Sequence, residues 1–259
     1  MRPPTQAIPP LDRDGVRAYL EMDAVANAVI WNRVIDDAGS WDVFVDRLPP
    51  SAVLGLEKPE REGEPTGVVL HAANPIAATD VAQALPSGFI FFHLAEEWTL
   101  PLLEARADRI HARPAWLFAL DAKDFVDLQR HETQPLSEDA ALMVARLWEP
   151  EWPAEGYVRR RIRDGPSFAI YADGRPVAWA LTHFETDRVS MMGFLHVLEE
   201  YRGKGYAKSV SSALVKDILA RGKTPALHVY VDNGPSLQLT AALGFHRVTR
   251  QIWGEARLR

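Results

Sequence analysis

The sequence predicts a mixed α/β fold built in two successive parts. Short strand-like runs alternate with helical stretches along the whole chain, and Asp173-Gly174 separates two of those runs as a two-residue hairpin turn would. The charge is also divided unequally: residues 1–134 hold 12 basic and 21 acidic side chains, whereas residues 135–259 hold 17 and 14. We therefore expect one α/β domain over residues 1–128 and a second, with a different task, over 129–259.

Composition narrows the class of protein. The chain has 259 residues, 47% hydrophobic and 25% charged, which is typical of a globular protein with a buried core. It has no cysteine, which excludes disulfides and thiolate catalysis. The N-terminus lacks the apolar segment of a signal peptide, and no apolar run reaches the roughly 18 residues that span a bilayer. We expect a cytoplasmic protein without a membrane partner.

Two further partner classes are not expected. The second half carries an excess of only three positive charges, and it lacks a basic patch interleaved with aromatic residues, so nucleic acid is not predicted as a partner. The histidines show no metal-binding spacing such as HExxH, so no metal site is predicted either.

The first half reads as helix, then strands and helices in alternation. Apolar residues at helical spacing predict one helix from Asp12 to Asp36. Four strand-like runs follow: Trp41–Asp46, Thr66–Ala72, Gly88–Leu94 and Pro114–Asp121. Helical stretches are predicted between them at Ala78–Leu85 and Glu96–Asp108.

The second half has a clearer order. Gln129–Ala141 reads as a junction in which Ser137 begins a helix that runs to Trp148, because acidic residues follow it in the first turn. A second helix is predicted over Glu155–Arg163. The remaining expected elements are a hairpin over Ser167–His183, a strand over Val189–Val197, a helix ending at Arg221, a strand over Ala226–Val231, a helix over Pro235–Leu243 and a last strand over His246–Trp253.

The segment Glu199–Val210, "EEYRGKGYAKSV", places two glycines just before a helix. The first turn of a helix leaves backbone N–H groups unpaired, and glycine lets that backbone come close to a ligand. Such a terminus binds anions, and Arg202, Lys204 and Lys208 add positive charge. By itself the pattern also fits a plain strand–turn–helix connection. It is not a dinucleotide-binding fingerprint, because Lys208 stands where the third glycine would be.

A family resemblance separates these alternatives. "LHVLEEYRGKGYA" resembles the acyl-CoA-binding motif of the GNAT superfamily of N-acyltransferases, Arg/Gln-x-x-Gly-x-Gly/Ala, with Arg202, Gly205 and Ala207 in the matching places. "VDNGPSLQLTAALGF" (residues 231–245) resembles the second signature of the superfamily, and the order of elements from Ser137 onward is similar as well. The resemblance covers roughly residues 128–255. The arrangement of the two halves looks most like the glycine N-acyltransferase-like group.

The resemblance implies where a cofactor would bind. The pantetheine arm of acetyl-CoA or another acyl-CoA would lie where the sheet opens at the strand ending in Val197, and the pyrophosphate would rest on the backbone before the helix. Asn233 matches an asparagine that contacts the pantetheine arm, although it is also a natural helix cap. The implied cofactor-binding residues are Leu195, Val197, Arg202, Gly203, Lys204, Gly205, Tyr206, Ala207, Asn233 and Ser236.

The same resemblance implies direct attack of an amine on the thioester, and two expected catalytic positions are altered. Met191 stands where many members place a base, and Thr240 stands where many place a tyrosine acid. His196 is our candidate base because its ordinary pKa suits proton transfer, although strand alternation points it away from Leu195 and Val197. Glu185 and Asp187 are alternatives that would act through water.

Three functions remain compatible with these residues. The first is an N-acyltransferase, in the first instance an N-acetyltransferase, acting on a primary amine of a small molecule such as an amino acid. The second is an acetyltransferase for protein N-termini or lysines, and the third is a non-catalytic acyl-CoA sensor. The arginines of Arg159–Arg163 fit either a solvated basic face or a site for a carboxylate-bearing acceptor.

The N-terminal half lacks the glycine motif. After its strand Gly88–Leu94 comes "AEEWTLPLL", which is acidic and has no glycine. Its strand–helix–strand order nevertheless echoes the second half. We hypothesise that it is a degenerate copy of the same fold that no longer binds the cofactor.

Overall fold

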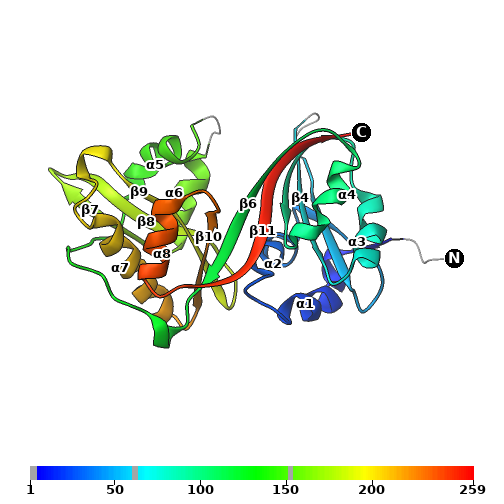
Figure 1. Ribbon diagram of the computed structural model, residues 1–259, viewed down its shortest axis with the longest axis horizontal. Helices are drawn as coiled ribbons and strands as arrows, with labels where there is room; N and C mark the ends of the chain where they lie inside the picture. Colours follow the sequence, from blue (N-terminus) through cyan, green and yellow to red (C-terminus); the bar gives the residue numbers. More distant parts are fainter. Residues whose placement is uncertain (1–4, 60–63, 151–153) are drawn as a thin grey trace. The chain divides into compact units, whose positions relative to one another are not determined.

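The computed structural model describes residues 5–59, 64–150 and 154–259 (Figure 1). Contacts divide them into two compact units. Unit 1 holds the described residues up to Leu117 together with Tyr230–Asp232 and Val248–Arg259, and unit 2 holds Phe118–Val229 and Asn233–Arg247. The chain thus passes into unit 2 within strand β6 (Ala107–Ala119) and returns to unit 1 within β11 (His246–Leu258). The division into domains 1–128 and 129–259 stays a prediction.

Unit 1 is built on a mixed sheet with the order β1-β2-β3-β4-β5-β11. Strands β2, β3 and β4 form an antiparallel meander, β5 runs parallel to β4, and the end of β11 pairs antiparallel with β5. The strands that β11 joins are β1 (Gln6–Ile8), β2 (Trp41–Val45), β3 (Ala52–Glu57), β4 (Thr66–Ala72) and β5 (Gly88–Leu94).

The helices of unit 1 are shorter than the sequence predicts. They are α1 (Asp14–Glu21), α2 (Ala28–Trp31), α3 (Pro75–Val81) and α4 (Leu100–Glu104). The single helix predicted from Asp12 to Asp36 is wrong, because the chain turns between α1 and α2. There the Asp23 Oδ1 accepts the Ala26 N–H at 2.9 Å, a local bond that competes with the helical ladder.

Strand β3 was not predicted because the usual pattern is absent from it. Its residues 52–55 are all buried, so polar and apolar residues do not alternate. Gly55 is required there, since a Cβ would collide with Val34 and Val69. The face of the sheet that carries α3 and α4 holds an apolar core shared with β3, β4, β5 and β11, including Leu54, Leu70 and Leu94.

Unit 2 has the strand order β10-β9-β8-β7. Its strands are β7 (Ser167–Ala172), β8 (Arg175–Glu185), β9 (Val189–Val197) and β10 (Thr224–Tyr230), and its helices are α5 (Ala141–Trp148), α6 (Glu155–Asp164), α7 (Tyr206–Ala220) and α8 (Gly234–Ala242). The predicted hairpin turn is confirmed: Asp173 and Gly174 both have positive φ, at 51° and 75°.

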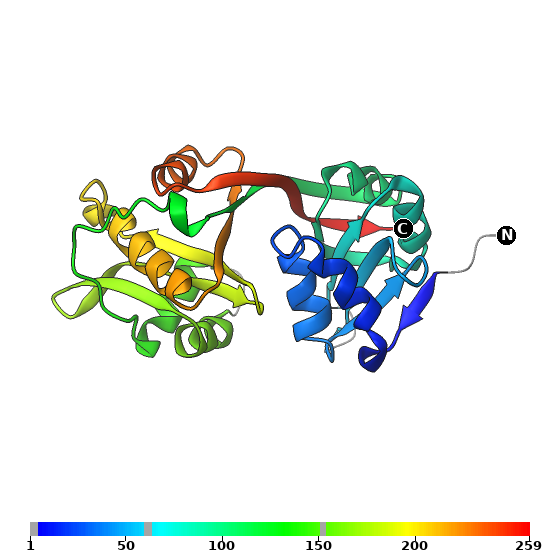
Figure 2. The same cartoon turned by 90° about the horizontal axis from the view of Figure 1, so that it is seen from below.

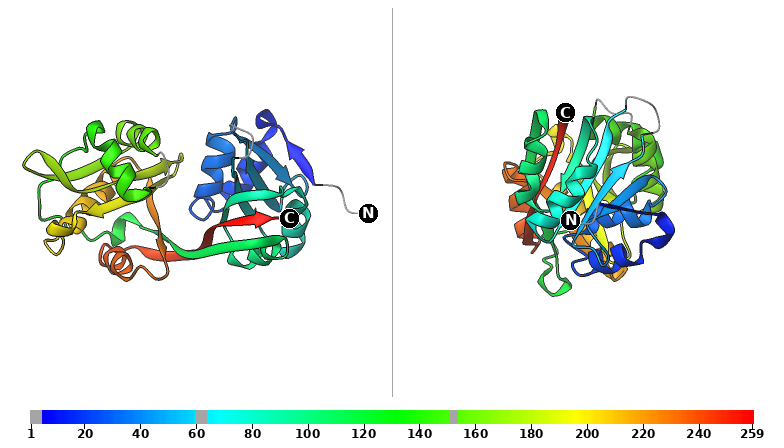
Figure 3. Two further views of the ribbon diagram at one scale, coloured as in Figure 1. Left: turned by 90° about the horizontal axis from the view of Figure 1, so that it is seen from above. Right: turned by 90° about the vertical axis from the view of Figure 1, so that its right-hand side faces the viewer.

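Helices cover both faces of the β7–β9 sheet. Helix α7 lies along β7, β8 and β9 on one face, while α5 and α6 lie on the other (Figures 2 and 3). The apolar side chains of Val210, Leu214 and Ile218 on α7 are fully buried, and burial of each contributes about 1.5–3 kcal/mol. Among the described residues, no helix is long and apolar enough to cross a membrane.

The two halves of the chain repeat one order of elements. Two helical segments precede an antiparallel meander, then come a helix, a parallel strand, a helix and a long strand: β2-β3-β4-α3-β5-α4-β6 in the first half and β7-β8-β9-α7-β10-α8-β11 in the second. This repeat supports the hypothesis of a second copy. It also corrects the comparison made from sequence, because the counterpart of β9 is β4, not Gly88–Leu94, which corresponds to β10.

Candidate active site

Strand β9 separates from β10 partway along its length. The parallel pairing joins Val189–Met192 to Thr224–Leu227 and ends there. Just beyond, β9 bulges: Leu181 pairs with Gly193 but Trp179 pairs with His196, so β9 holds one extra residue. Phe194 takes a left-handed conformation with φ of 51°, which costs a residue with a Cβ about 1–2 kcal/mol. The bulge turns the end of β9 away from its neighbour.

Aromatic side chains on the α5 and α6 face hold this bulge, and the sequence analysis missed them. The Phe194 ring centroid lies 4.5 Å from that of Trp148 and 4.2 Å from that of His183. Tyr157 donates its hydroxyl to the His183 carbonyl at 2.7 Å. Gly193 sits against the His183 ring with no room for a Cβ. This packing offsets the cost of the strained backbone.

A cleft of about 890 Å³ opens beside the end of β9. Nine of the ten predicted cofactor residues line it: Leu195, Val197, Arg202, Gly203, Lys204, Gly205, Tyr206, Ala207 and Ser236. The other lining residues are Leu128, Arg130, His196, Tyr201, Lys208, Pro235, Gln238, Leu239 and Ala242. The structure therefore brings together three segments of the chain, around residues 128–130, 195–208 and 235–242.

The glycine loop has the backbone that an anion site requires. Gly203 and Gly205 have φ of 75° and 84°, which favours glycine at both positions. Gly205 is the N-cap of α7, and it has no side-chain cap from the part of the chain that the structure describes. The first N–H groups of α7 consequently have no partner from within the helix, and they lie at the wall of the cleft. A phosphate bound there would complete the helix end.

The cleft is basic. Arg130, Arg202, Lys204 and Lys208 line it, and none of its described lining residues is Asp or Glu. Arg202 donates through Nε to the Val197 carbonyl at 3.2 Å, which holds its guanidinium beside the end of β9. The Lys204 ammonium lies 4.7 Å from the Tyr201 ring centroid. The charge and the free helix terminus together suit a polyanionic ligand.

Two residues that sequence reasoning missed hold the loop in place. The Ser209 hydroxyl, fully buried on α7, accepts the N–H groups of Arg130 and His131 at 3.1 and 3.2 Å and donates to the Gly205 carbonyl at 3.3 Å. The His131 Nε2 is hydrogen-bonded to the Lys204 carbonyl at 2.9 Å. The role of Ser209 was partly predictable from sequence, because "AKSVSSA" puts serines on an otherwise apolar helix face.

Asn233 is placed differently from the other predicted cofactor residues. Its Oδ1 accepts the Ser236 N–H at 3.2 Å and caps α8, the alternative role weighed from sequence, and it is not among the lining residues. Its contact with a pantetheine arm stays a prediction. Met191 and Thr240, at the altered catalytic positions, are 2% and 4% exposed and line no part of the cleft.

Of the described residues that line the cleft, His196 is the one histidine. Its ring stacks on Trp179, with centroids 5.0 Å apart and planes 20° from parallel. Burial lowers the pKa of His196, and the nearby charge of Arg202 lowers it further. The imidazole is therefore neutral at physiological pH and free to accept a proton.

The other predicted polar residues lie outside the cleft lining. Glu185 accepts from the Ser190 hydroxyl at 2.5 Å and lies 3.7 Å from Lys223, and Asp187 is exposed. Arg159 pairs with Glu155 one turn away, as on a solvated face, whereas Arg161 donates to the Thr182 carbonyl and hydroxyl. None of these side chains lines the cleft. No group of acidic or histidine residues in the described part of the chain is arranged to hold a metal ion.

Comparisons with known proteins bear on the fold of the chain. The family model described as FR47-like protein matches residues 171–254. A solved Drosophila protein superposes with a TM-score of 0.72 at 15% identity, covering 97% of this chain and 98% of that one. A GCN5-related N-acetyltransferase from Sphaerobacter thermophilus gives 0.66 at 15% identity, covering 98% and 95%. No curated protein matches.

A further neighbour bears on the repeat of elements. A tandem GNAT protein from the clavulanic acid biosynthesis pathway superposes with a TM-score of 0.51 at 15% identity, covering 97% of this chain and 98% of that one. At such identities the likeness shows the fold alone. The chain has the mixed α/β fold of GNAT proteins, with two copies of the order of elements, and the predicted fold class is confirmed.

Proposed function

We propose that this protein is an acyl-CoA-dependent N-acyltransferase that acts on a primary amine of a small molecule such as an amino acid, with acetyl-CoA as the first candidate donor. One observation carries the proposal: the basic cleft joins the end of a strand that has left its neighbour to a glycine loop at an uncapped helix N-terminus. A long flexible thioester with a polyanionic end has the matching chemistry.

Different residues of unit 2 would bind different parts of the acyl-CoA. The backbone N–H groups of Gly205, Tyr206 and Ala207 would hold a pyrophosphate, with Arg202, Lys204 and Lys208 adding charge; all six residues line the cleft. The freed edge of β9 at Leu195 and Val197 offers backbone groups to the amides of a pantetheine arm. When bound, acyl-CoA supplies an activated thioester carbonyl. Holding that carbonyl beside the amine accounts for a large part of the expected rate.

The chemical step needs one proton acceptor. The amine nitrogen forms a bond to the thioester carbon, the carbon–sulfur bond breaks, and the sulfur leaves as the CoA thiolate. His196 is our candidate to accept the proton released by the amine, because it lines the cleft and its pKa is lowered. Thr240 is buried away from the cleft, so we assign no acid to the thiolate.

A thiol-release assay tests the function. Purified protein is incubated with acetyl-, propionyl- or benzoyl-CoA and a panel of amines that includes glycine, other amino acids, a lysine peptide and a peptide with a free N-terminus. We expect release of CoA with at least one small amine. Turnover with peptides alone supports a protein acetyltransferase instead. Binding of CoA without turnover on any amine supports a sensor, and no binding of CoA overturns the proposal.

The same assay also tests the resemblance to the glycine N-acyltransferase-like group. It predicts that glycine is an acceptor and that benzoyl-CoA is a donor. A preference for acetyl-CoA and for amines other than glycine would support N-acyltransfer in general. It would contradict the narrower resemblance to the glycine N-acyltransferase-like group.

The pH dependence of catalysis tests His196. A base with a lowered pKa stays neutral down to a pH below the ordinary histidine value of about 6.5, so kcat/KM should fall only below that pH. His196→Gln should lower kcat about 100-fold or more and remove this acidic limb. Arg202→Gln should shift the acidic limb to higher pH, because the arginine cation no longer opposes protonation of His196. His246→Gln, an exposed histidine of unit 2, is the control; a limb retained in His196→Gln excludes His196 as the base.

A further inference from the structure

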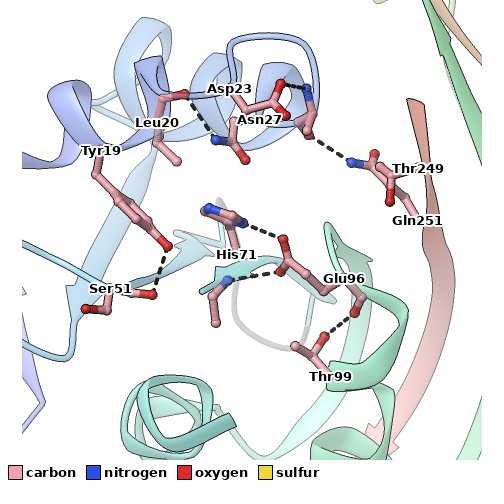
Figure 4. Close-up of polar contacts among 12 residues, drawn as sticks. Tyr19, Leu20, Asp23, Asn27, Ser51, His71, Glu96, Thr99, Thr249 and Gln251 are labelled. Carbon is pink, nitrogen blue, oxygen red and sulfur yellow. Dashed lines mark hydrogen bonds and ion pairs between the residues drawn. The ribbon is translucent and has the colours of Figure 1, made fainter. Parts of the chain in front are cut away.

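Unit 1 contains a second, smaller pocket of about 300 Å³ on the α1 and α2 side of its sheet (Figure 4). It lies where β4 and β5 end and β11 begins. Its lining residues are Tyr19, Met22, Asp23, Ala26, Asn27, His71, Ala95, Glu96, Val248 and Thr249. No step of the proposed function uses any of them.

The pocket is not a copy of the cofactor cleft. In unit 1 the parallel pairing of β4 with β5 runs from Thr66 and Ile90 to Leu70 and Leu94, the last residue of β5, and the Ala95 N–H continues the ladder to the Leu70 carbonyl. The Glu96 Oε2 accepts the next free backbone donor, the Ala72 N–H, at 3.0 Å. There is consequently no gap between these strands for an extended ligand.

A histidine–carboxylate pair forms the floor of this pocket. The His71 Nδ1 lies 2.5 Å from the Glu96 Oε1, and the His71 ring stacks on Tyr19 with centroids 5.0 Å apart. Tyr19 donates its hydroxyl to the Ser51 carbonyl at 2.8 Å, outside the pocket lining. These bonds fix the Glu96 carboxylate in one orientation, and Figure 4 shows it facing the space below Asn27.

Asn27 supplies an independent sign of a ligand. It is 2% exposed and donates through Nδ2 to the Leu20 carbonyl at 3.0 Å, but its buried Oδ1 has no hydrogen-bond partner among the described residues. Figure 4 shows this oxygen directed away from Leu20, toward the open space above His71 and Glu96. Buried acceptors in native proteins nearly always have a donor, so an unpaired one that faces a pocket indicates a missing donor.

The charge of the lining residues indicates what kind of hydrogen-bond donor would bind in the pocket. Asp23 and Glu96 are carboxylates, and none of the described lining residues is Lys or Arg. Burial raises the pKa of Tyr19 to about 12, and the negative charges of Glu96 and Asp46 raise it further. Acceptors and negative charge together favour a cation that donates several hydrogen bonds.

We propose that unit 1 binds a small organic cation through a primary ammonium group. The Glu96 carboxylate and the Asn27 Oδ1 receive its N–H donors, with Asp23 adding charge at the pocket mouth. A short apolar chain then packs against Met22, Val248 and the Tyr19 ring. The pocket of about 300 Å³ has room for a small organic cation and is about a third of the volume of the cofactor cleft, about 890 Å³. This site is separate from the acyltransfer site and does not depend on it.

Calorimetric titration of the full chain with propylammonium tests the site, and propan-1-ol serves as the uncharged probe of equal shape. We expect propylammonium to bind with a dissociation constant below about 10 mM and propan-1-ol not to bind. Glu96→Gln and Asp23→Asn should each weaken binding at least about tenfold, because each keeps its shape while losing a charge. Glu97→Gln is the matched control: this neighbouring carboxylate pairs with Arg250 and is outside the pocket lining.

The outcomes separate this site from the cofactor cleft. Binding that persists when CoA is saturating, and that only the pocket variants weaken, supports the proposal. Equal binding of propan-1-ol, loss of binding on adding CoA, or an equal effect of Glu97→Gln overturns it. If Glu96→Gln proves unstable by thermal melting, Asp23→Asn decides, since its side chain is exposed and asparagine can still accept the Ala26 N–H.

Discussion

Replacing Gly205 by alanine is expected to weaken acetyl-CoA binding about ten- to hundredfold. Gly205 has φ of 84° at the N-cap of α7, and the left-handed conformation costs alanine about 1–2 kcal/mol. Relief of that strain rotates the peptide and redirects the N–H groups that follow it. A charge-assisted hydrogen bond from such a group contributes about 1.5–3 kcal/mol, which corresponds to this loss of affinity. Calorimetry with acetyl-CoA measures it directly.

The control for this prediction is Gly222→Ala. Gly222 follows the other end of α7 with φ of 71°, and a Cβ there would meet no atom within 4 Å. The backbone strain is therefore matched, but the site is distant from the cleft lining. We expect both variants to lower the melting temperature similarly and only Gly205→Ala to lose affinity. An equal loss in both would mean that the loop acts through stability alone.

The sequence predicts some elements closely because local pattern and burial agree in them. Strands Thr66–Ala72 and Gly88–Leu94 have the bounds that the sequence predicts. The single helix predicted from Asp12 to Asp36 does not match the structure. The helical spacing of apolar residues continues through a segment in which Asp23 forms a turn. β3 was missed for the opposite reason: burial on both faces removes the alternation that identifies a strand.

Some features of the candidate site could likewise be predicted from the sequence, and others could not. The glycine loop is recognisable because positive φ leaves a residue signature, and nine of the ten predicted residues line the cleft. The bulge at Phe194 has no such signature, since a residue with a Cβ takes the left-handed conformation there. Its cause lies in packing against Trp148 and His183, which sequence separation hides.

The difference between the two copies also depends on long-range pairing. Both halves place a parallel strand beside the end of a meander, but only β9 leaves its partner. In the first half, Glu96 occupies the backbone donor at Ala72. Glu96 therefore lies both at the closed strand ends and in the lining of the unit 1 pocket, so the degenerate copy that we hypothesise and the cation site that we propose would depend on the same carboxylate.

Ser209→Ala is expected to destabilise the protein by about 2 kcal/mol and to weaken acetyl-CoA binding as well. The fully buried hydroxyl accepts the backbone N–H groups of Arg130 and His131, and an unsatisfied buried donor costs about 1–3 kcal/mol. Without this anchor, His131 no longer holds the Lys204 carbonyl from a fixed position. The loop must then be ordered by the ligand, which lowers the affinity.

Ser211→Ala separates this role from the general effect of removing a helical serine. Ser211 is 3% exposed on the same helix, and within the described residues its hydroxyl accepts no bond from residues 129–131. Alanine favours the helix, so its stability should change by less than about 1 kcal/mol, with affinity unchanged. Urea unfolding and calorimetry measure both quantities. If Ser209→Ala keeps full affinity despite its lower stability, the anchor supports the fold but does not position the loop.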